Sequence, residues 1–370
     1  MRADEDARHQ DEVTDRAFMR RAIALAARGW GQTAPNPMVG AVVVRDGAVV
    51  GEGYHRRYGE AHAEAEALRA AGDAARGATA YVSLEPCNHF GKTPPCTRAL
   101  IDAGVARVVA AVRDPNPAAK GGLETLREAG VRVDVGVEEA AARELNAPFF
   151  HGFAADRPWV TLKLALSLDG AITDATRRPR WLTGDASRRE VHRLRAGSDA
   201  VAVGIGTAVA DDPALTVRHG DPPRVPPRRV VFDRALRLPP ESVLARTARE
   251  TPTIVVAEAG TDARERALRA AGVEVLRAAG PADALRRLRA AGVRALLVEG
   301  GARLAGSLLE QSLVDRLVIF QAPVILGAGA LGAFAYAPPV LPGELPRLPV
   351  LERRELGDDL MTVYALESKP

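Results

Sequence analysis

Residues 62–96 read HAEAEALRAAGDAARGATAYVSLEPCNHFGKTPPC and contain both cysteines of the 370-residue chain, Cys87 and Cys96. A histidine and an acid, His62 and Glu64, precede them at the start of a predicted helix. Three explanations compete: two unrelated buried cysteines, a disulfide, or a metal site. A lone disulfide is unusual in a cytoplasmic protein, where clustered Cys and His residues more often bind metal or catalyse a reaction.

The composition is that of an ordinary globular protein. The chain is 47% hydrophobic and 26% charged, and it has no run of about 18 apolar residues. Its first residues, MRADEDARHQDE, are too polar for a signal peptide, so we expect a disordered lead-in over residues 1–13 and a cytoplasmic location. A net charge of +3 suits an anionic small molecule but requires no partner. Because aromatic residues make up only 4%, we expect no nucleic-acid partner, and because no long apolar run is present, we expect no membrane partner.

The opening stretch has the donor set of a hydrolytic zinc centre. Such a centre uses three protein ligands and leaves one position for water. His62, Cys87 and Cys96 provide three ligands of the kind that zinc prefers, and Glu64 is placed to move protons. Zinc deaminases of nucleobases carry the pattern H-x-E with P-C-x-x-C. Here eight residues separate the cysteines instead of two, so a loop must bring the two thiolates together.

Strands and helices alternate in two halves, which predicts two α/β domains. In the first half, MVGAVVVR and AVVGEGY flank Asp46-Gly47, a dipeptide that favours a hairpin turn. The segment AADRPW, residues 154–159, reads as the boundary. We therefore expect a first domain over residues 14–153 and a second over residues 157–367.

The second half shows neither a metal pattern nor a dinucleotide fingerprint. Its Gly204-x-Gly206 lacks the third glycine, because Val209 stands at that position. The segment EGGARLAGS places Gly300 and Gly301 between a strand and a helix, where backbone N–H groups can bind an anion. A second segment, GIGTAVADDPALTVR, is predicted to place three polar residues on a loop: Thr207, Asp211 and Arg218.

The strand TLKLALSLDG carries Lys163, one of only four lysines among the 50 basic residues. Strand alternation predicts one apolar face, made by Leu162, Leu164, Leu166 and Leu168. The other face is more polar and consists of Thr161, Lys163, Ala165, Ser167 and Asp169. Such a face is either an exposed edge or the wall of a polar cleft.

Several motifs of the first half resemble the deaminase half of the bifunctional deaminase/reductase family of riboflavin biosynthesis: PNPMVGAVVV, GEGYH, HAEAEAL, LEPCNHFGKTPPC and DPNP. The longer cysteine spacing is normal in that family. The resemblance implies a cytidine-deaminase-like three-layer sandwich that uses Zn²⁺ to remove an amino group from a phosphoribosylated diaminopyrimidine. It further implies that Asn36 contacts the pyrimidine and that Lys92 supplies charge for the phosphate.

The second half resembles the reductase half of the same family through KLALSLDG, Trp181, TAVADDPALTVR and VEGGARLAGSLL. The resemblance spans roughly residues 14–366. It implies a dihydrofolate-reductase-like fold that uses NADPH to reduce the ribose ring to a ribityl chain. The implied cofactor-binding residues are Ala165, Trp181, Thr207, Asp211, Gly301, Ala302, Arg303, Leu304, Ala305, Gly306 and Ser307. The implied substrate-binding residues are Arg195, Leu215, Arg218 and Glu299, the arginines being suited to a phosphate.

We predict that Lys163 is the catalytic polar group near the reacting ribose and that the chain forms a homo-oligomer. Two departures from the family pattern, Pro179 and Arg234, leave an alternative in which the second domain binds nucleotide without reducing. A nucleoside or tRNA deaminase with an appended domain is a rival that predicts the short cysteine spacing. A structural zinc site in a regulatory protein is a second rival, which predicts a fourth ligand.

Overall fold

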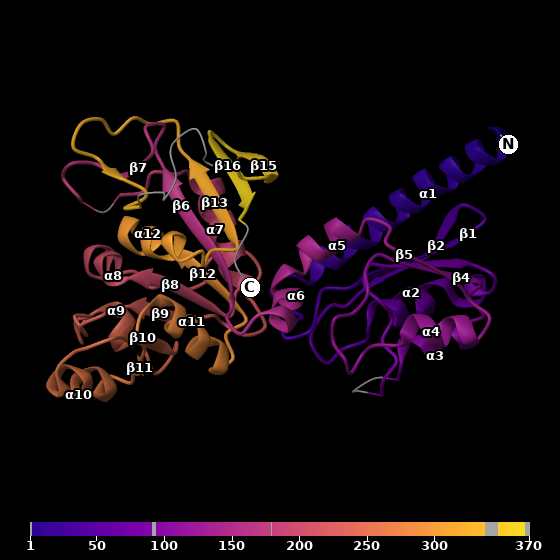
Figure 1. The fold of residues 1–370 in the computed structure, drawn as a ribbon, viewed down its shortest axis with the longest axis horizontal. Coiled ribbons are helices and arrows are strands. Elements are labelled where there is room, and N and C mark those ends of the chain that lie inside the picture. Colours follow the sequence, from indigo (N-terminus) through magenta and orange to yellow (C-terminus); the bar gives the residue numbers. More distant parts are fainter. Residues whose placement is uncertain (1, 91–93, 179, 337–346, 367–370) are drawn as a thin grey trace. The chain divides into compact units, whose positions relative to one another are not determined.

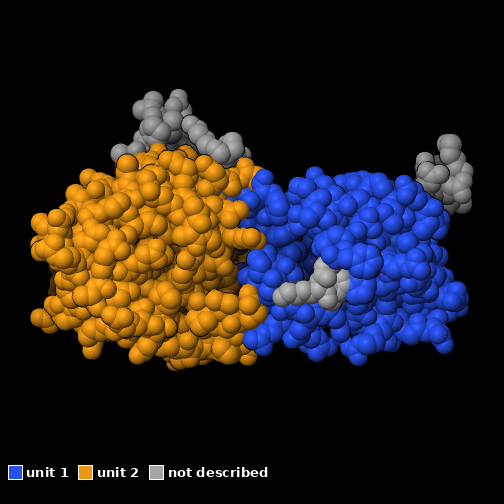
Figure 2. Space-filling view, turned by 90° about the horizontal axis from the view of Figure 1, so that it is seen from below, with its two compact units in different colours: residues 1–153 blue, residues 154–370 orange. Residues whose placement is uncertain are grey.

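The computed structural model describes residues 2–90, 94–178, 180–336 and 347–366. The chain divides into two compact units, residues 1–153 and 154–370, coloured separately in Figure 2. Each unit is a β-sheet covered by helices on both faces (Figure 1). In the described ranges, no helix combines the length and the apolar character needed to cross a membrane.

The sheet of the first unit has the strand order β2-β1-β3-β4-β5. A hairpin at its edge turns at Asp46 and Gly47, whose φ angles of 50° and 76° are those of the predicted Asp-Gly turn. β1 is antiparallel to β2 and β3, while β3, β4 and β5 are parallel. The strands are β1 (Gly40–Arg45), β2 (Ala48–Tyr54), β3 (Thr79–Val82), β4 (Arg107–Ala110) and β5 (Arg132–Val135).

Helices form the two outer layers of this unit. On one face of the sheet, α1 packs against β1 and β3 and contacts α5. On the other face, α2 covers β1 and β2, α3 packs beside α2, and α4 packs beside α3. The helices are α1 (Arg2–Ala26), α2 (Ala63–Ala71), α3 (Cys96–Asp102), α4 (Gly122–Glu128), α5 (Glu139–Leu145) and α6 (Ala147–Ala154). Short 3₁₀ turns follow α1 (Ala27–Gly29) and α2 (Gly72–Ala75). The unit is therefore a three-layer sandwich.

The first helix differs from the sequence-based expectation. It extends through the segment 2–13, which was predicted to be a disordered lead-in to a helix starting at Thr14. An ion pair between Glu12 and Arg16, one turn apart, supports the helix at the point where the polar composition suggested disorder. The prediction of disorder was wrong here because it was based on polar composition, and exposed helices are also polar.

The second unit is built on a nine-stranded sheet of order β11-β10-β9-β8-β12-β6-β13-β16-β15. The first seven strands in that order are parallel to one another. The strand β16 is antiparallel to both of its neighbours, β13 and β15. The strands are β6 (Trp159–Leu166), β8 (Ala200–Gly204), β9 (Arg228–Phe232), β10 (Thr253–Ala257), β11 (Glu274–Arg277), β12 (Ala295–Glu299), β13 (Arg316–Gln321), β15 (Val350–Leu356) and β16 (Asp359–Ala365). A small two-stranded sheet pairs β7 (Ala171–Thr173) with β14 (Leu331–Gly332).

Apolar residues of both sheet faces make the core of this unit. One cluster joins β6, β8 and β12 to α11 and α12, and a second joins β8, β9 and β10 to α8, α9 and α10. The helices are α7 (Asp185–Ala196), α8 (Ile205–Asp211), α9 (Val243–Arg246), α10 (Asp262–Ala270), α11 (Pro281–Ala290) and α12 (Ala302–Glu310). Because seven neighbouring strands are parallel, their carboxyl ends meet at one edge of the sheet, where ligands commonly bind.

The strand β6 shows the predicted alternation over most of its length. Leu162, Leu164 and Leu166 are buried, and Lys163 lies on the opposite face. The prediction fails at Leu168, which lies beyond the strand and is 54% exposed. The chain reverses there, as Ser167 and Ala171 pair through the backbone to start β7.

Candidate active sites

The starts of two helices bring the three predicted metal ligands together. His62 is the residue that precedes α2, Cys96 is the first residue of α3, and Cys87 lies in the loop that follows β3. His62 Nδ1 lies 3.3 Å from the Sγ atom of Cys96 and 3.5 Å from that of Cys87. The backbone N–H of Cys96 also points to Cys87 Sγ, at 3.5 Å.

These three donors fit a zinc ion. All three ligand atoms lie within 4.8 Å of one another. A tetrahedral ion with Zn–S and Zn–N distances of about 2.3 and 2.0 Å requires ligand atoms roughly 3.5 Å apart. Hydrogen bonds from Cys96 and His62 lower the pKa of Cys87 to about 4, so Cys87 is a thiolate at neutral pH. The site therefore has the ligand type, the number and the spacing for zinc with a fourth position open.

Glu64 lies in the first turn of α2 and is only 4% exposed. Burial, followed by the charge of Cys87, raises the pKa of Glu64 to about 7, whereas the charge of His62 lowers it. A bound dication lowers it further. A buried carboxyl group beside the metal ligands can accept a proton from water and return it to a leaving group.

A short chain of polar contacts leads from Asn36 to the metal ligands. The His55 ring stacks edge-on against His62 with ring centroids 5.4 Å apart. His55 Nδ1 contacts the carbonyl oxygen of Ala61 at 3.0 Å, and Asn36 Nδ2 lies 3.3 Å from His55 Nε2. Burial lowers the pKa of His55, so the neutral ring donates through Nδ1 and accepts the amide hydrogen of Asn36. Asn36 is therefore linked to the metal ligand His62 through His55.

Two glycines of β2 set the position of α2. A Cβ atom on Gly53 would stand 2.4 Å from the carbonyl oxygen of Ala63, and one on Gly51 would stand 2.2 Å from that of Ala67. The helix that carries His62 and Glu64 therefore rests directly on the backbone of the strand. The motif GEGY provides these two glycines, which explains why side chains are missing at alternate positions of β2.

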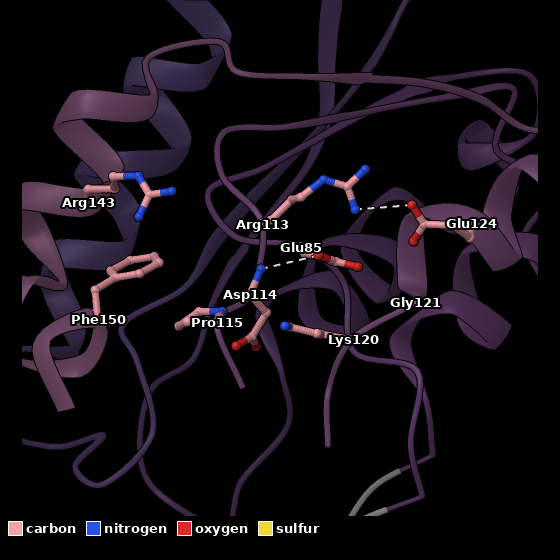
Figure 3. A pocket seen from close by; sticks show the side chains of 9 residues that line it. All are labelled: Glu85, Arg113, Asp114, Pro115, Lys120, Gly121, Glu124, Arg143 and Phe150. Atoms are coloured by element: carbon pink, nitrogen blue, oxygen red, sulfur yellow. Dashed lines mark hydrogen bonds and ion pairs between the residues drawn. The ribbon is translucent and has the colours of Figure 1, made fainter. Parts of the chain in front are cut away.

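A cavity of about 410 Å³ opens next to the metal-binding loop (Figure 3). Its wall is made by Glu85, Arg113, Asp114, Pro115, Lys120, Gly121, Glu124, Arg143 and Phe150. Glu85 stands two residues before Cys87, and its carboxylate accepts hydrogen bonds from the backbone N–H groups of Asp114 and Gly122, at 3.1 and 3.0 Å. Figure 3 shows Lys120 extending toward the Asp114 side chain, and Arg143 beside Phe150 on the opposite wall.

None of the residues that line this cavity was predicted from the sequence to be a site residue. Burial, and then the charge of Glu85, raise the pKa of Asp114 to about 6, although a backbone hydrogen bond from Asn116 opposes the rise. Glu85 and Asp114 belong to the motifs LEPC and DPNP, which were noted only as parts of the resemblance. They come together because the loops that follow β3 and β4 fold against each other, which is not visible from the spacing of residues along the chain.

In the second unit, three charged residues meet on neighbouring strands. Glu299, the last residue of β12, is aligned with Lys163 of β6. The Arg195 guanidinium on α7 donates to both carboxylate oxygens of Glu299, at 2.5 and 2.8 Å. Lys163 Nζ lies 5.5 Å from the centre of the Phe320 ring. Burial lowers the pKa of Lys163, while Glu299 raises it and Arg195 lowers it.

Arg195, which was predicted to bind substrate, forms several hydrogen bonds within the protein. Besides Glu299, it donates through Nη1 to the carbonyl oxygen of Thr216 at 2.9 Å. Its side chain is buried, and three of its nitrogens are hydrogen-bonded within the protein. Arg195 therefore fixes the carboxylate of Glu299 and the backbone at Thr216. Arg218 is exposed, so its guanidinium is accessible to an anion.

The two predicted nucleotide-binding segments lie side by side. A Cβ atom on Gly301, at the start of α12, would stand 3.1 Å from Thr207 Oγ1. Thr207 and Asp211 were predicted on a loop, but they lie in helix α8, because Ile205 and Ala208 pack into the core and stabilise a short helix there. The starts of α8 and α12 thus follow the adjacent parallel strands β8 and β12. This pair of helix starts can receive an anionic nucleotide.

Other predicted residues have different environments. Trp181 is 70% exposed, and the Arg188 guanidinium lies 5.4 Å from the centre of its ring. Leu215 is buried in the core and has a φ angle of 52°. Within the segment 301–307, three members are buried against the protein, namely Ala302, Ala305 and Gly306, while Arg303 is exposed and Gly301, Leu304 and Ser307 are half-buried. Ala165 follows Lys163 on the same face of β6.

Three further positions relate to the phosphate and to the departures from the family pattern. Lys92 and Pro179 lie outside the described residues. Arg234 is exposed, directly after Asp233 at the end of β9, and forms a 2.9 Å ion pair with Glu258.

Comparisons with known proteins match both halves of the chain. Residues 12–112 match the cytidine and deoxycytidylate deaminase zinc-binding region, and residues 158–357 match the RibD C-terminal domain. The riboflavin biosynthesis protein RibD of Escherichia coli is 40% identical over 94% of this chain and 98% of its own length. That of Aquifex aeolicus is 46% identical over 85% of this chain and 88% of its own length.

The chain belongs to the RibD family. It is a bifunctional deaminase and reductase of riboflavin biosynthesis, a hydrolase and an oxidoreductase in one polypeptide that uses Zn²⁺ and NADPH. The alternative of a deaminase with a silent second domain is not favoured, because RibD relatives match both halves together.

Solved RibD structures share the whole fold. The Acinetobacter baumannii RibD structure (form 1) aligns with a TM-score of 0.81 at 38% identity, covering 96% of this chain and 99% of that chain. The diaminohydroxyphosphoribosylaminopyrimidine deaminase/5-amino-6-(5-phosphoribosylamino)uracil reductase of Thermotoga maritima aligns with a TM-score of 0.82 at 34% identity, with the same coverage. The expected cytidine-deaminase-like sandwich and RibD reductase domain are thereby confirmed.

Proposed function

We propose that a deaminase domain over residues 14–153, within the first unit, deaminates 2,5-diamino-6-ribosylamino-4(3H)-pyrimidinone 5′-phosphate at the His62–Cys87–Cys96 site. The observation that carries this proposal is the convergence of these three donors beside the buried Glu64. Zinc held there supplies a water that is readily ionised near neutral pH. Glu64 accepts the proton from the attacking water and delivers it to the amino group, which leaves as ammonia. Asn36, held by His55, contacts the pyrimidine ring.

A reductase domain over residues 157–367, within the second unit, then reduces the ribosyl group of the deaminated product with NADPH. The starts of α8 and α12, with Thr207 and Gly301, would hold the phosphates of the cofactor, and the predicted cofactor residues 302–307 follow along α12. The cofactor provides a hydride for the anomeric carbon. Lys163 provides the proton that the ring oxygen needs when the ring opens, so one hydride and one proton are consumed. Glu299 keeps Lys163 protonated, and Arg218 meets the 5′-phosphate.

A direct assay tests this second proposal. Purified full-length protein is supplied with 5-amino-6-(5-phosphoribosylamino)uracil and NADPH, and the absorbance of the reduced nicotinamide is followed. We expect loss of that absorbance only when the substrate is present, and a Lys163→Met variant that binds NADPH normally but turns over far more slowly. A Lys163→Met variant with unchanged kcat would contradict the role of Lys163, whereas no turnover by the unmodified protein would contradict reduction itself.

The cellular setting completes the proposal. The protein acts in the cytoplasm on small phosphorylated pyrimidines, without a nucleic-acid or membrane partner, as a homo-oligomer. Its strand β15, which pairs with β16 and is the last strand in the order of the nine-stranded sheet, supports association, because Val350 and Leu351 are exposed on it. Sedimentation analysis tests the oligomer, and a Val350→Lys variant that sediments unchanged would exclude this strand as the contact.

A further inference from the structure

Helix α7 holds the segment that carries Arg218 through two side chains one helical turn apart. Arg195 Nη1 donates to the carbonyl oxygen of Thr216 at 2.9 Å. The backbone N–H of Arg218 donates to His192 Nδ1 at 3.0 Å. The two bonds fix the backbone on either side of residue 217.

The segment has little regular structure of its own to hold it. Residues 212–227, between α8 and β9, contain neither helix nor strand. Leu215 is in the left-handed region at a φ of 52°, a conformation that a branched side chain adopts only when its surroundings impose it. Its side chain is anchored in the core, whereas Arg218 is exposed. The direction in which Arg218 projects therefore depends on the tertiary hydrogen bonds next to it.

His192 can act only as an acceptor at Nδ1 in this position. The side chain is 5% exposed, and the His219 ring stacks edge-on against it with centroids 4.8 Å apart. Burial, and then the positive charges of Arg195, His219 and Arg218, lower the pKa of His192 to about 4. The ring is therefore neutral, with its proton on Nε2, and Nδ1 is available to the Arg218 N–H.

We propose that His192 is a positioning residue of the reductase site, and that it holds the backbone of Arg218 so that the guanidinium meets the 5′-phosphate of the substrate. This inference rests on the proposed role of Arg218 as the phosphate ligand. On this view α7 positions the substrate-binding side of the reductase site: Arg195 bonds to Glu299 and to the backbone of Thr216, and His192 bonds to the backbone of Arg218.

Two near-isosteric substitutions separate positioning from packing. Asparagine places a carbonyl oxygen close to the position of Nδ1 and can still accept the Arg218 N–H, whereas leucine fills a similar space without an acceptor. For His192→Leu we expect KM for the phosphorylated substrate to rise about tenfold, the effect of one lost hydrogen bond in a buried pair. KM for NADPH, and deamination by the same polypeptide, should not change. His192→Asn should restore most of the affinity.

A second experiment measures the same variants with a substrate that lacks the 5′-phosphate. Because His192 acts through Arg218, His192→Leu should leave KM for the dephosphorylated substrate unchanged. An equal loss for both substrates, or an equal loss in the leucine and asparagine variants, would overturn the positioning role. Arg218→Gln tests the underlying assignment separately: if that variant keeps the KM for the phosphorylated substrate, Arg218 is not the phosphate ligand and the proposed function fails at that residue.

A measurement on the unmodified protein keeps the proposal testable should the leucine variant fail to fold. Native-state hydrogen exchange of the Arg218 amide should be slow, although the residue lies at the surface on an irregular segment. Exchange at the rate of an unstructured peptide would show that the bond to His192 is not kept in solution and would overturn the proposal.

Discussion

Arg195 on α7 and Glu299 at the end of β12 form a two-pronged ion pair, 104 residues apart in sequence, directly beside Lys163. Both partners are largely buried, with side-chain exposures of 8% and 13%. Arg195 compensates the charge of Glu299, and Glu299 in turn favours the charged form of Lys163. The protonation state of the lysine is therefore linked to the ion pair.

The pH dependence of reduction follows from this link. Burial holds the pKa of Lys163 below its ordinary value of 10.5. If the ammonium form is the active one, kcat is full below that pKa and falls as the pH rises through it. In Glu299→Gln the attraction to the ammonium is lost, so the basic limb of the kcat–pH profile should move to lower pH. Steady-state oxidation of NADPH over a pH series measures the shift; a limb that stays in place, or moves to higher pH, would contradict the role of Lys163.

The zinc site predicts a selective loss. In Cys87→Ser a thiolate ligand is replaced by a hydroxyl that binds zinc poorly. We expect the zinc content to fall well below one ion per chain and deamination to disappear. Reduction of supplied 5-amino-6-(5-phosphoribosylamino)uracil should persist, because the reductase residues belong to the other compact unit. Metal analysis and the two assays on one preparation check this, and simultaneous loss of both activities would show that the two units depend on each other.

The contact between β2 and α2 predicts an indirect effect on the metal. A Cβ atom on Gly53 would stand 2.4 Å from Ala63 O and 2.5 Å from Ala67 N, which are backbone atoms that cannot move aside separately. Gly53→Ala should therefore push α2 outward and destabilise the unit by about 1–3 kcal/mol. His62 and Glu64 move with the helix, so weaker zinc binding should accompany the loss. A variant with unchanged zinc affinity, measured by chelator competition, would mean that the helix does not set the site.

A buried network predicts the acid sensitivity of the first unit. Arg107 donates to both oxygens of Asp15 at 2.8 and 2.6 Å, and the Tyr81 hydroxyl donates to one of them at 2.7 Å. Burial alone raises the pKa of Asp15, but the hydrogen bonds from Arg107 and Tyr81, together with the charge of Arg107, lower it below 3.8. Its stabilising contribution is therefore complete above the unfolded value and disappears as the pH falls through the lower folded value.

Asp15→Asn should cost about 3 kcal/mol of unfolding free energy at neutral pH, because the half-buried Arg107 loses one of its two counter-charges and keeps only Asp134. The cost should shrink on acidification, since the unmodified protein then loses the same interaction. Tyr81→Phe, which removes one neutral donor, should cost only about 1 kcal/mol. Denaturant titrations at two pH values measure both, and a cost for Asp15→Asn that grows on acidification would contradict the assignment.

The metal site could be predicted from sequence because zinc accepts few residue types, and three of them stand close to one acid along the chain. The cluster of Lys163, Glu299 and Arg195 could be predicted only through the family resemblance. Lys163 and Glu299 become neighbours because β12 lies beside β6, a strand order that no local pattern records. For the same reason the sequence does not show that Arg195 donates hydrogen bonds to Glu299 and Thr216.

Helix α8 and the start of α1 show a second limit of the sequence reading. Glycine, aspartate and proline surround the GTAVAD segment and predict a loop, but two buried side chains, Ile205 and Ala208, are enough to hold seven residues as a helix. At the chain start, charged residues predicted disorder, although they are also compatible with an exposed helix. Core packing stabilises α8, and an ion pair one turn apart supports α1. Local helix propensity includes neither interaction, so it does not predict these helices.

The most direct test of the account is Glu64→Gln in the full-length protein, measured for zinc content, deamination and reduction in one preparation. Glutamine keeps the size of the side chain but cannot carry the proton. The account predicts one zinc ion per chain, deamination reduced by about 10²- to 10⁴-fold, and reduction of supplied intermediate unchanged. Deamination that survives with full zinc content would show that Glu64 is not the acid and base of the site, and the central assignment would be wrong.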